Sequence, residues 1–221
     1  MRSIVYLILL ILGMNLSVRA QFSTQEFTPK PLPALPQMPA HIWLQAQEQT
    51  GFEAWPTELQ TGFRLMNYAR VYPKRFWDSV VSPIIRVYPF LKTKESASLQ
   101  RDLEQTPSLP PFSINLTLQR LAQEHAEDLW KNPQQPSHTN SKGISFSKRM
   151  NLAGIQKCAA ENISIGSQAV ALSLVLLYLD IDIPTLGHRK NLLNPQMVEI
   201  GLGWKQNESL FVWVQDLACK Q

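Results

Sequence analysis

The sequence lacks the motifs that mark common metal-dependent and nucleophilic enzymes. Its 221 residues include only two cysteines and no Cys-x-x-Cys pair, which excludes a zinc knuckle. It has no His-Glu-x-x-His segment and no Gly-x-Ser-x-Gly elbow, so the usual signatures of zinc proteases and α/β-hydrolases are missing. The sequence therefore offers none of these local signatures of a catalytic or metal site.

Charged residues are also scarce. They make up 17% of the chain, and 21 Lys and Arg against 17 Asp and Glu give a net charge of +4, which falls to +2 without Arg2 and Arg19. The nearest basic group, Arg70 to Arg75, has only three such residues among aromatic ones. We therefore expect no nucleic-acid partner. Hydrophobic residues, at 44%, indicate a packed core, and the length favours one domain.

The N-terminus has the pattern of a secretory signal. Arg2 precedes the apolar run Ile4 to Leu12, and Val18-Arg19-Ala20 places small residues where a signal peptidase cleaves. We expect a signal peptide at 1–20, cleaved after Ala20, and a secreted or periplasmic protein; the alternative is an uncleaved anchor. We expect no membrane span in the mature chain, because its apolar segment at 169–179 is too short.

The next segment is rich in proline, which removes backbone donors and favours extended conformations. Five prolines occur between positions 29 and 39. We therefore predict a linker at 21–54 and a folded domain at 55–221. In an oxidising compartment the pair Cys158 and Cys219 favours a disulfide; two buried thiols are the alternative.

Apolar periodicity predicts a mixed fold. Thr57 with Gln60 fits a capping box at the start of the first helix. Asn115 fits the N-cap of an amphipathic helix. His125 lies on the apolar face of that helix, so we expect it to be a packed, hydrogen-bonded core histidine. The patterns predict helices near 57–70, 75–81 (ending before Pro83), 95–104, 118–129 and 169–180, a polar loop at 132–148, and a hairpin of 198–204 with 210–215. Helices with a late hairpin indicate an α+β or layered α-β-α domain.

Four ionisable residues stand in polar or glycine-bearing segments between core elements: His138, Glu161, Asp180 and His188. Imidazoles and carboxylates suit zinc and related ions, and they also suit acid and base catalysis. Their spacing is not that of local metal ligands, so both interpretations remain open at this point.

Short motifs occur in an order that resembles a known family. They are Asn67-Tyr68-Ala69-Arg70, His125-Ala126-Glu127-Asp128, Ser137-His138, Ala160-Glu161-Asn162-Ile163, Gly187-His188-Arg189-Lys190-Asn191-Leu192-Leu193 and Val214-Gln215-Asp216. Together they resemble a CAP domain, the family of cysteine-rich secretory proteins, antigen 5 and pathogenesis-related proteins, also called SCP-like extracellular proteins. The likeness is to its bacterial branch and extends from about Glu58 to the C-terminus.

The resemblance implies a three-layer α-β-α sandwich of the CAP type with a cleft that carries two His and two acidic residues. His138 matches the first His, Glu161 the Glu of the Glu-Asn-Ile motif and His188 the second His. Asp180 matches the remaining acid, with Asp182 as the alternative. A metal, if bound, would contact His138 and His188; no cofactor is required, and zinc or another divalent ion is the one that these residues would suit.

Two functions follow as hypotheses. The missing nucleophile favours a non-enzymatic module that binds a small apolar ligand, a cell-envelope component or a protein partner. The alternative is a peptidase-like hydrolase, in which a His and Glu pair activates water or a hydroxyl such as that of Ser137 or Ser141. A structural or adhesive role is a third interpretation.

Overall fold

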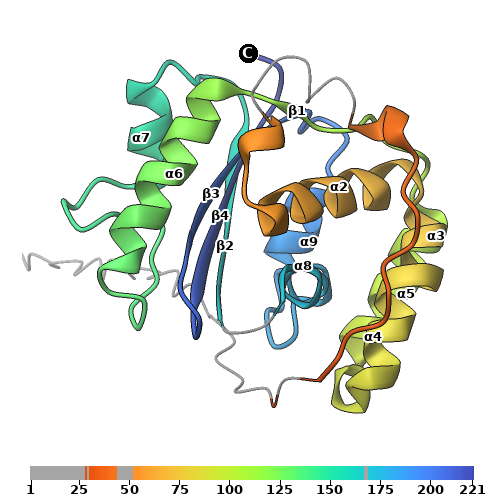
Figure 1. The fold of residues 1–221 in the computed structure, drawn as a ribbon. Helices are drawn as coiled ribbons and strands as arrows, with labels where there is room; N and C mark the ends of the chain where they lie inside the picture. The colour runs from red at the N-terminus through yellow and green to blue at the C-terminus, as the bar shows by residue number, and fades with distance from the viewer. Residues whose placement is uncertain (1–27, 29, 44–51, 167–168) are drawn as a thin grey trace, which may run out of the picture.

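The computed structural model describes residues 28, 30–43, 52–166 and 169–221. A four-stranded sheet is covered by helices on both faces (Figure 1), which confirms the predicted α+β sandwich. The predicted signal peptide lies outside the described residues. The α-helices are α2 (Thr57–Val71), α3 (Pro73–Phe76), α4 (Ser82–Val87), α5 (Lys94–Gln105), α6 (Leu116–Trp130), α7 (Phe146–Leu152), α8 (Val170–Leu179) and α9 (Gly187–Leu192).

The strands are β1 (Ser113–Ile114), β2 (Ala159–Gly166), β3 (Glu199–Gln206) and β4 (Phe211–Ala218), in the order β1-β3-β4-β2. The predicted hairpin is confirmed as the antiparallel pair β3–β4. β2 was not predicted, because its charged and amide residues interrupt the usual strand pattern. It pairs antiparallel with β4 and places Glu161 opposite Asp216.

Helix α6 lies directly on β3 because two strand positions carry no side chain. A Cβ atom on Gly201 would lie 2.0 Å from the Leu118 carbonyl carbon, and one on Gly203 would lie 2.0 Å from the Ala122 oxygen. β1 covers only the start of β3. Beyond β1, the Gln119 side chain on α6 satisfies the backbone of β3 at Leu202. Its amide nitrogen donates to Leu202 O at 2.6 Å, and its amide oxygen accepts from Leu202 N at 2.9 Å.

The opposite face of the sheet is covered by α2, α8 and α9, with α3, α4 and α5 packed outside them (Figure 1). As predicted, α8 is apolar and buried on nearly all sides; among its residues only Leu176 is partly exposed. Asn115 caps α6 as predicted, accepting from the Thr117 and Leu118 amides. The helix expected at 95–104 is α5.

Two local predictions are wrong. The N-cap of α2 is Pro56 rather than Thr57, and the Gln60 side chain instead donates to Trp55 O at 2.9 Å. The second helix does not stop before Pro83: α3 continues through the π-helical turn Trp77–Val81 into α4. Pro83 follows directly on the π-helical turn, in which Ser82 N donates to Trp77 O, so the regular hydrogen-bond ladder is already interrupted where the proline lacks its N–H.

Part of the segment expected to be a linker packs on the domain. Residues 30–43 include Ile42, which is buried, and the Asn67 amide donates to its carbonyl oxygen at 3.1 Å. The Arg64 guanidinium lies 5.1 Å from the Trp43 ring. The boundary at residue 55 stays a prediction.

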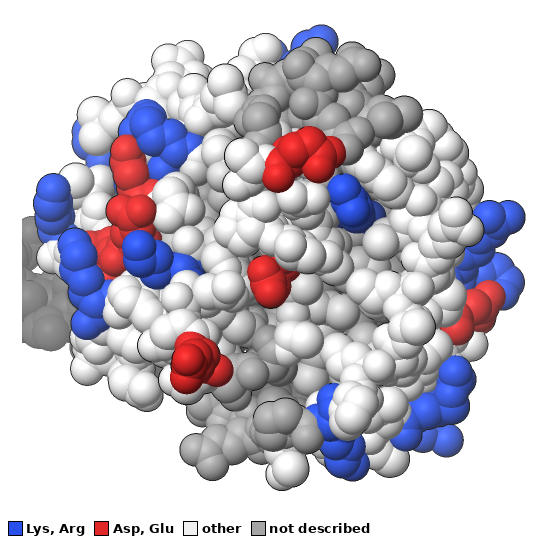
Figure 2. All heavy atoms as spheres, in the orientation of Figure 1, with Lys and Arg blue, Asp and Glu red and all other residues white. Residues whose placement is uncertain are grey.

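The predicted disulfide is confirmed, with the Cα atoms of Cys158 and Cys219 5.4 Å apart. It ties the start of β2 to the residue that follows β4. Among the described helices, none is both long and apolar enough to cross a lipid bilayer. Figure 2 shows acidic and basic side chains spread over one face of the molecule, without a single large basic patch.

Candidate functional site

Glu161 forms the centre of one ionic cluster. It comes from the edge strand β2, on the sheet face that α6 covers, and its side chain is only 1% exposed. Its Oε1 accepts a hydrogen bond of 2.8 Å from His138 Nδ1, whose side chain is 41% exposed. The buried carboxylate thus holds a partly exposed imidazole in place.

Arg149 on α7 completes this cluster. Its Nη2 donates to Glu161 Oε2, and its Nη1 donates to the carbonyl oxygen of His138 at 3.0 Å. The guanidinium therefore fixes both the carboxylate and the loop that carries the imidazole. No local pattern in the sequence indicated the partner of Arg149.

His125 is buried beside the same carboxylate. Its Nε2 lies 2.9 Å from Ser137 O and 3.7 Å from Glu161 Oε2. A carbonyl can only accept, so Nε2 carries the hydrogen and Nδ1, which has no partner among the described residues, does not. Burial lowers the pKa of His125, which keeps the ring neutral. The prediction of a packed, hydrogen-bonded histidine is confirmed.

Asp216 adds a second buried carboxyl group. It faces Glu161 across the β2–β4 pair and is fully buried, and neither of its oxygens accepts a hydrogen bond from a described residue. Burial, followed by the nearby charge of Glu161, raises its pKa well above the ordinary value. Asp216 therefore holds its proton to a higher pH than an ordinary carboxyl group does.

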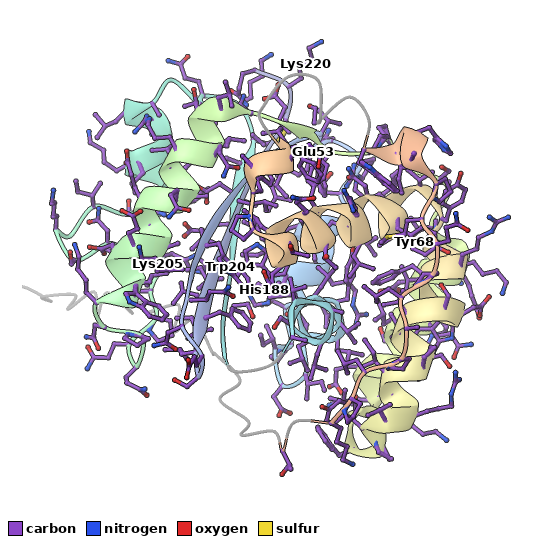
Figure 3. The ribbon with its side chains drawn as sticks, in the orientation of Figure 1. Glu53, Tyr68, His188, Trp204, Lys205 and Lys220 are labelled. Carbon is purple, nitrogen blue, oxygen red and sulfur yellow. A yellow bond between two sulfur atoms is a disulfide. The ribbon has the colours of Figure 1, made fainter. Side chains whose placement is uncertain are left out.

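Asp180 and His188 form a separate pair on the other side of the sheet. Asp180 ends α8 in a left-handed conformation, and its Oδ1 lies 2.5 Å from His188 Nδ1. Its Oδ2 accepts from the Arg189 amide at 3.0 Å. Figure 3 shows His188 on the α8 side of the sheet. The alternative acid, Asp182, is exposed and makes no ion pair with a described residue.

Arg189 holds the connection between α8 and α9. Its guanidinium donates to the carbonyl oxygens of Tyr178 and Leu179 at 2.7 and 3.0 Å, which satisfies acceptors at the C-terminus of α8. It also pairs with Asp102 on α5 at 2.9 Å. This buried side chain fixes the loop that carries the Asp180–His188 pair.

The four predicted site residues therefore form two carboxylate–imidazole pairs, His138–Glu161 and Asp180–His188. No hydrogen bond or ion pair of these described residues joins one pair to the other. In both pairs the carboxylate accepts from Nδ1, so Nδ1 carries the hydrogen. Nε2 makes no hydrogen bond with a described residue, so it is the ring nitrogen that is left to contact a ligand.

The donor set does not fit a resident metal centre. Zinc sites normally take three or four protein ligands, and the described residues contain no group of three or more His, Cys, Asp or Glu that could hold an ion. Metal binding through His138 and His188 stays a prediction.

The two serines considered for a hydrolase contact other groups. Ser137 Oγ accepts from the Thr139 amide, and Ser141 Oγ donates to Asp128. Neither hydroxyl is hydrogen-bonded to an imidazole, the arrangement that activates a serine nucleophile.

Two surface pockets lie apart from these pairs. One, of about 320 Å³, lies by the β3–β4 turn and the N-terminal ends of α2 and α8. The other, of about 510 Å³, lies between α5 and the α8–α9 loop. None of the four predicted site residues lines either pocket.

Comparisons with known proteins agree with the motif order. A sequence model of the cysteine-rich secretory protein (CAP) family matches residues 63–217. The uncharacterized protein YkwD of Bacillus subtilis (strain 168) is 28% identical over 127 residues, which are 58% of this chain and 47% of that protein. The chain thus spans about half the length of this relative.

Among solved structures, an outer surface protein from Borrelia burgdorferi is 21% identical, with a TM-score of 0.43, over 62% of this chain and 92% of that one. An extracellular protein containing an SCP domain from Bacillus anthracis str. Ames is 24% identical, with a TM-score of 0.39, over 51% and 35% of the two chains.

Proposed function

This chain belongs to the cysteine-rich secretory protein (CAP) family, and we propose that it is an exported, non-enzymatic binding module. One observation carries the proposal. His138 and His188 are each held through Nδ1 by a buried carboxylate, which leaves Nε2 free to contact a ligand. A carboxylate behind an imidazole fixes the ring orientation and raises its basicity as a ligand or acceptor.

The contacts of Glu161 and of the two candidate serines favour binding over hydrolysis. Glu161 is held by Arg149 and His138, so moving its carboxylate to serve as a base would break an ion pair and a hydrogen bond. The candidate serines are hydrogen-bonded elsewhere. The ligand classes that we propose are a small apolar molecule, a cell-envelope component or a protein partner.

Export is supported by two features of the chain. The first 20 residues have the charge and apolar pattern of a signal peptide. The disulfide between Cys158 and Cys219 is of the kind that persists in oxidising compartments.

Zinc serves as the test probe, because it reports accessible Nε2 atoms whether or not it is the natural ligand. We would titrate Zn²⁺ into residues 21–221 at pH 7 and follow the histidine resonances by NMR, for the wild type and for His138→Ala and His188→Ala. His41→Ala is the matched control, since His41 is exposed and contacts Tyr72 rather than an acid. Circular dichroism would verify that each variant is folded.

The proposal predicts that Zn²⁺ shifts the resonances of His138 and His188, that each Ala variant loses the corresponding contact, and that the control binds as the wild type does. Folded wild type in which neither histidine responds would contradict it. Turnover of peptide or cell-wall substrates that disappears in Glu161→Gln would establish the hydrolase instead.

A further inference from the structure

The larger pocket is formed by two segments that are far apart in sequence. Its lining residues are Lys94, Glu95 and Ser98 from the start of α5, and Asp182, Ile183, Pro184 and Leu186 from the loop between α8 and α9. We call it the α5 pocket. Its volume of about 510 Å³ lies within the range of small-molecule sites. Its lining includes none of the residues of the two carboxylate–imidazole pairs, so a ligand can bind there independently of the proposed function.

The walls of the α5 pocket are fixed by buried contacts. Arg189 donates to Ser98 Oγ at 2.9 Å and to Glu95 O at 3.0 Å, and the same guanidinium holds the end of α8. The loop also contains two turns, closed by Ile183 N to Asp180 O and by Leu186 N to Ile183 O, both at 3.0 Å. The pocket therefore exists before a ligand arrives, which lowers the entropy cost of binding.

The lining combines an apolar wall with an excess of negative charge. Ile183, Pro184 and Leu186 provide the apolar surface. Glu95 is paired with Lys94, with Nζ and Oε1 3.7 Å apart, but the Lys94 side chain is 91% exposed and extends into solvent. The Asp182 carboxylate has no cationic partner among the described residues. A ligand that complements this lining has an apolar body and a positive charge.

From this complementarity we propose that the α5 pocket binds an aliphatic ammonium group, with Asp182 as its counter-ion and the apolar wall packing on its methylene chain. Two sources share this chemistry: a free alkylamine and the lysine side chain of a peptide. The proposal also assigns a role to Asp182, which does not pair with His188; Asp180, two positions earlier, does.

The test uses probes with the same six-carbon body and different charge: hexylammonium, 1-hexanol and hexanoate. Binding to residues 21–221 would be measured at pH 7 and low salt by NMR titration. Asp182→Asn removes the charge and suits the left-handed backbone there, where φ is +61°. Leu186→Asn likewise suits φ of +51° and removes apolar surface. Glu208→Gln, which removes one acid from the smaller pocket, is the matched control.

We expect hexylammonium to bind at least tenfold more tightly than hexanol, and hexanoate most weakly. Asp182→Asn should reduce hexylammonium affinity to about that of hexanol, Leu186→Asn should weaken both, and the control should change neither. A comparison with Nα-acetyl-lysine methylamide then separates the sources: tighter binding of this probe than of hexylammonium identifies a peptide, and the reverse a free amine. Absence of binding by both amines, tighter binding of hexanoate, or an unchanged affinity in Asp182→Asn would overturn the proposal.

Discussion

The ion pair between Arg149 and Glu161 gives the sharpest prediction for stability. Both side chains are buried, at 8% and 1% exposed, so solvent screens their interaction little. Arg149→Met would leave the Glu161 charge buried without its guanidinium partner, beside His138, the neutral His125 and the carboxyl group of Asp216. Removing one partner of a buried pair costs about 3–5 kcal/mol, most of it from the charge left behind. We therefore expect the free energy of unfolding to fall by that amount.

Urea unfolding, followed by the fluorescence of the buried Trp204 and Trp213, would measure this loss. The double variant Arg149→Met/Glu161→Gln removes the uncompensated charge and should recover about 2 kcal/mol or more. Arg120→Met is the control, because Arg120 pairs with Glu124 on the surface of α6 and both are more than half exposed; it should change stability by about 0.5 kcal/mol or less. A loss below about 1 kcal/mol for Arg149→Met, or no recovery in the double variant, would refute the reasoning.

Three further predictions concern stability. Asp216 has a raised pKa in the folded state, so the folded protein holds this proton more tightly than the unfolded chain does, and the wild type loses stability as pH rises above 3.8. Asp216→Asn has no proton to lose at this position. In parallel urea titrations between pH 4 and 7, its free energy of unfolding should therefore rise relative to that of the wild type, by about 1.4 kcal/mol for each unit of pKa shift. The buried guanidinium of Arg70 donates to four carbonyl oxygens, those of Pro110, Leu192, Asn194 and Met197, and burial lowers its pKa to about 10. Arg70→Lys should therefore lower the free energy of unfolding by more than about 3 kcal/mol in the same assay. A smaller loss would show that a single ammonium group can replace the planar guanidinium. Replacing Cys158 and Cys219 by Ala opens a loop that spans 61 positions and should cost about 4 kcal/mol, and an unchanged midpoint would contradict the chain-entropy estimate.

The sequence predicted those elements that have strong local signals. The stripe from Leu118 to Leu129 and the Asn115 cap located α6, and alternation located the β3–β4 hairpin. Strand β2 could not be found in this way, because its central Glu161 and Asn162 are buried by partners that come from other parts of the chain. The capping box predicted at Thr57 does not form for a similar reason. The Gln60 side chain instead donates to the carbonyl oxygens of Glu53 and Trp55, which precede the helix.

The candidate site was predictable as a set of residues but not as an arrangement. The family motifs identified His138, Glu161, Asp180 and His188, while no spacing could show that they pair across 23 and 8 positions. Arg149 and Asp216 were not recognised as members of the Glu161 cluster, because neither has a local pattern that differs from that of an ordinary helix or strand residue. Long-range pairing of buried charges is set by the tertiary fold, which the sequence pattern does not encode locally.

The central claim is that a buried carboxylate holds Nδ1–H of His138 and of His188, which leaves each Nε2 to contact a ligand. Long-range ¹H–¹⁵N NMR correlations of the imidazole rings test it most directly, because they distinguish the two neutral tautomers. Spectra recorded above the histidine titration range should show both rings in the Nδ1–H form, with His125 in the Nε2–H form as an internal contrast. If His138 and His188 were found in the Nε2–H form, their outer nitrogens would not be free to accept a ligand, and the account would be contradicted.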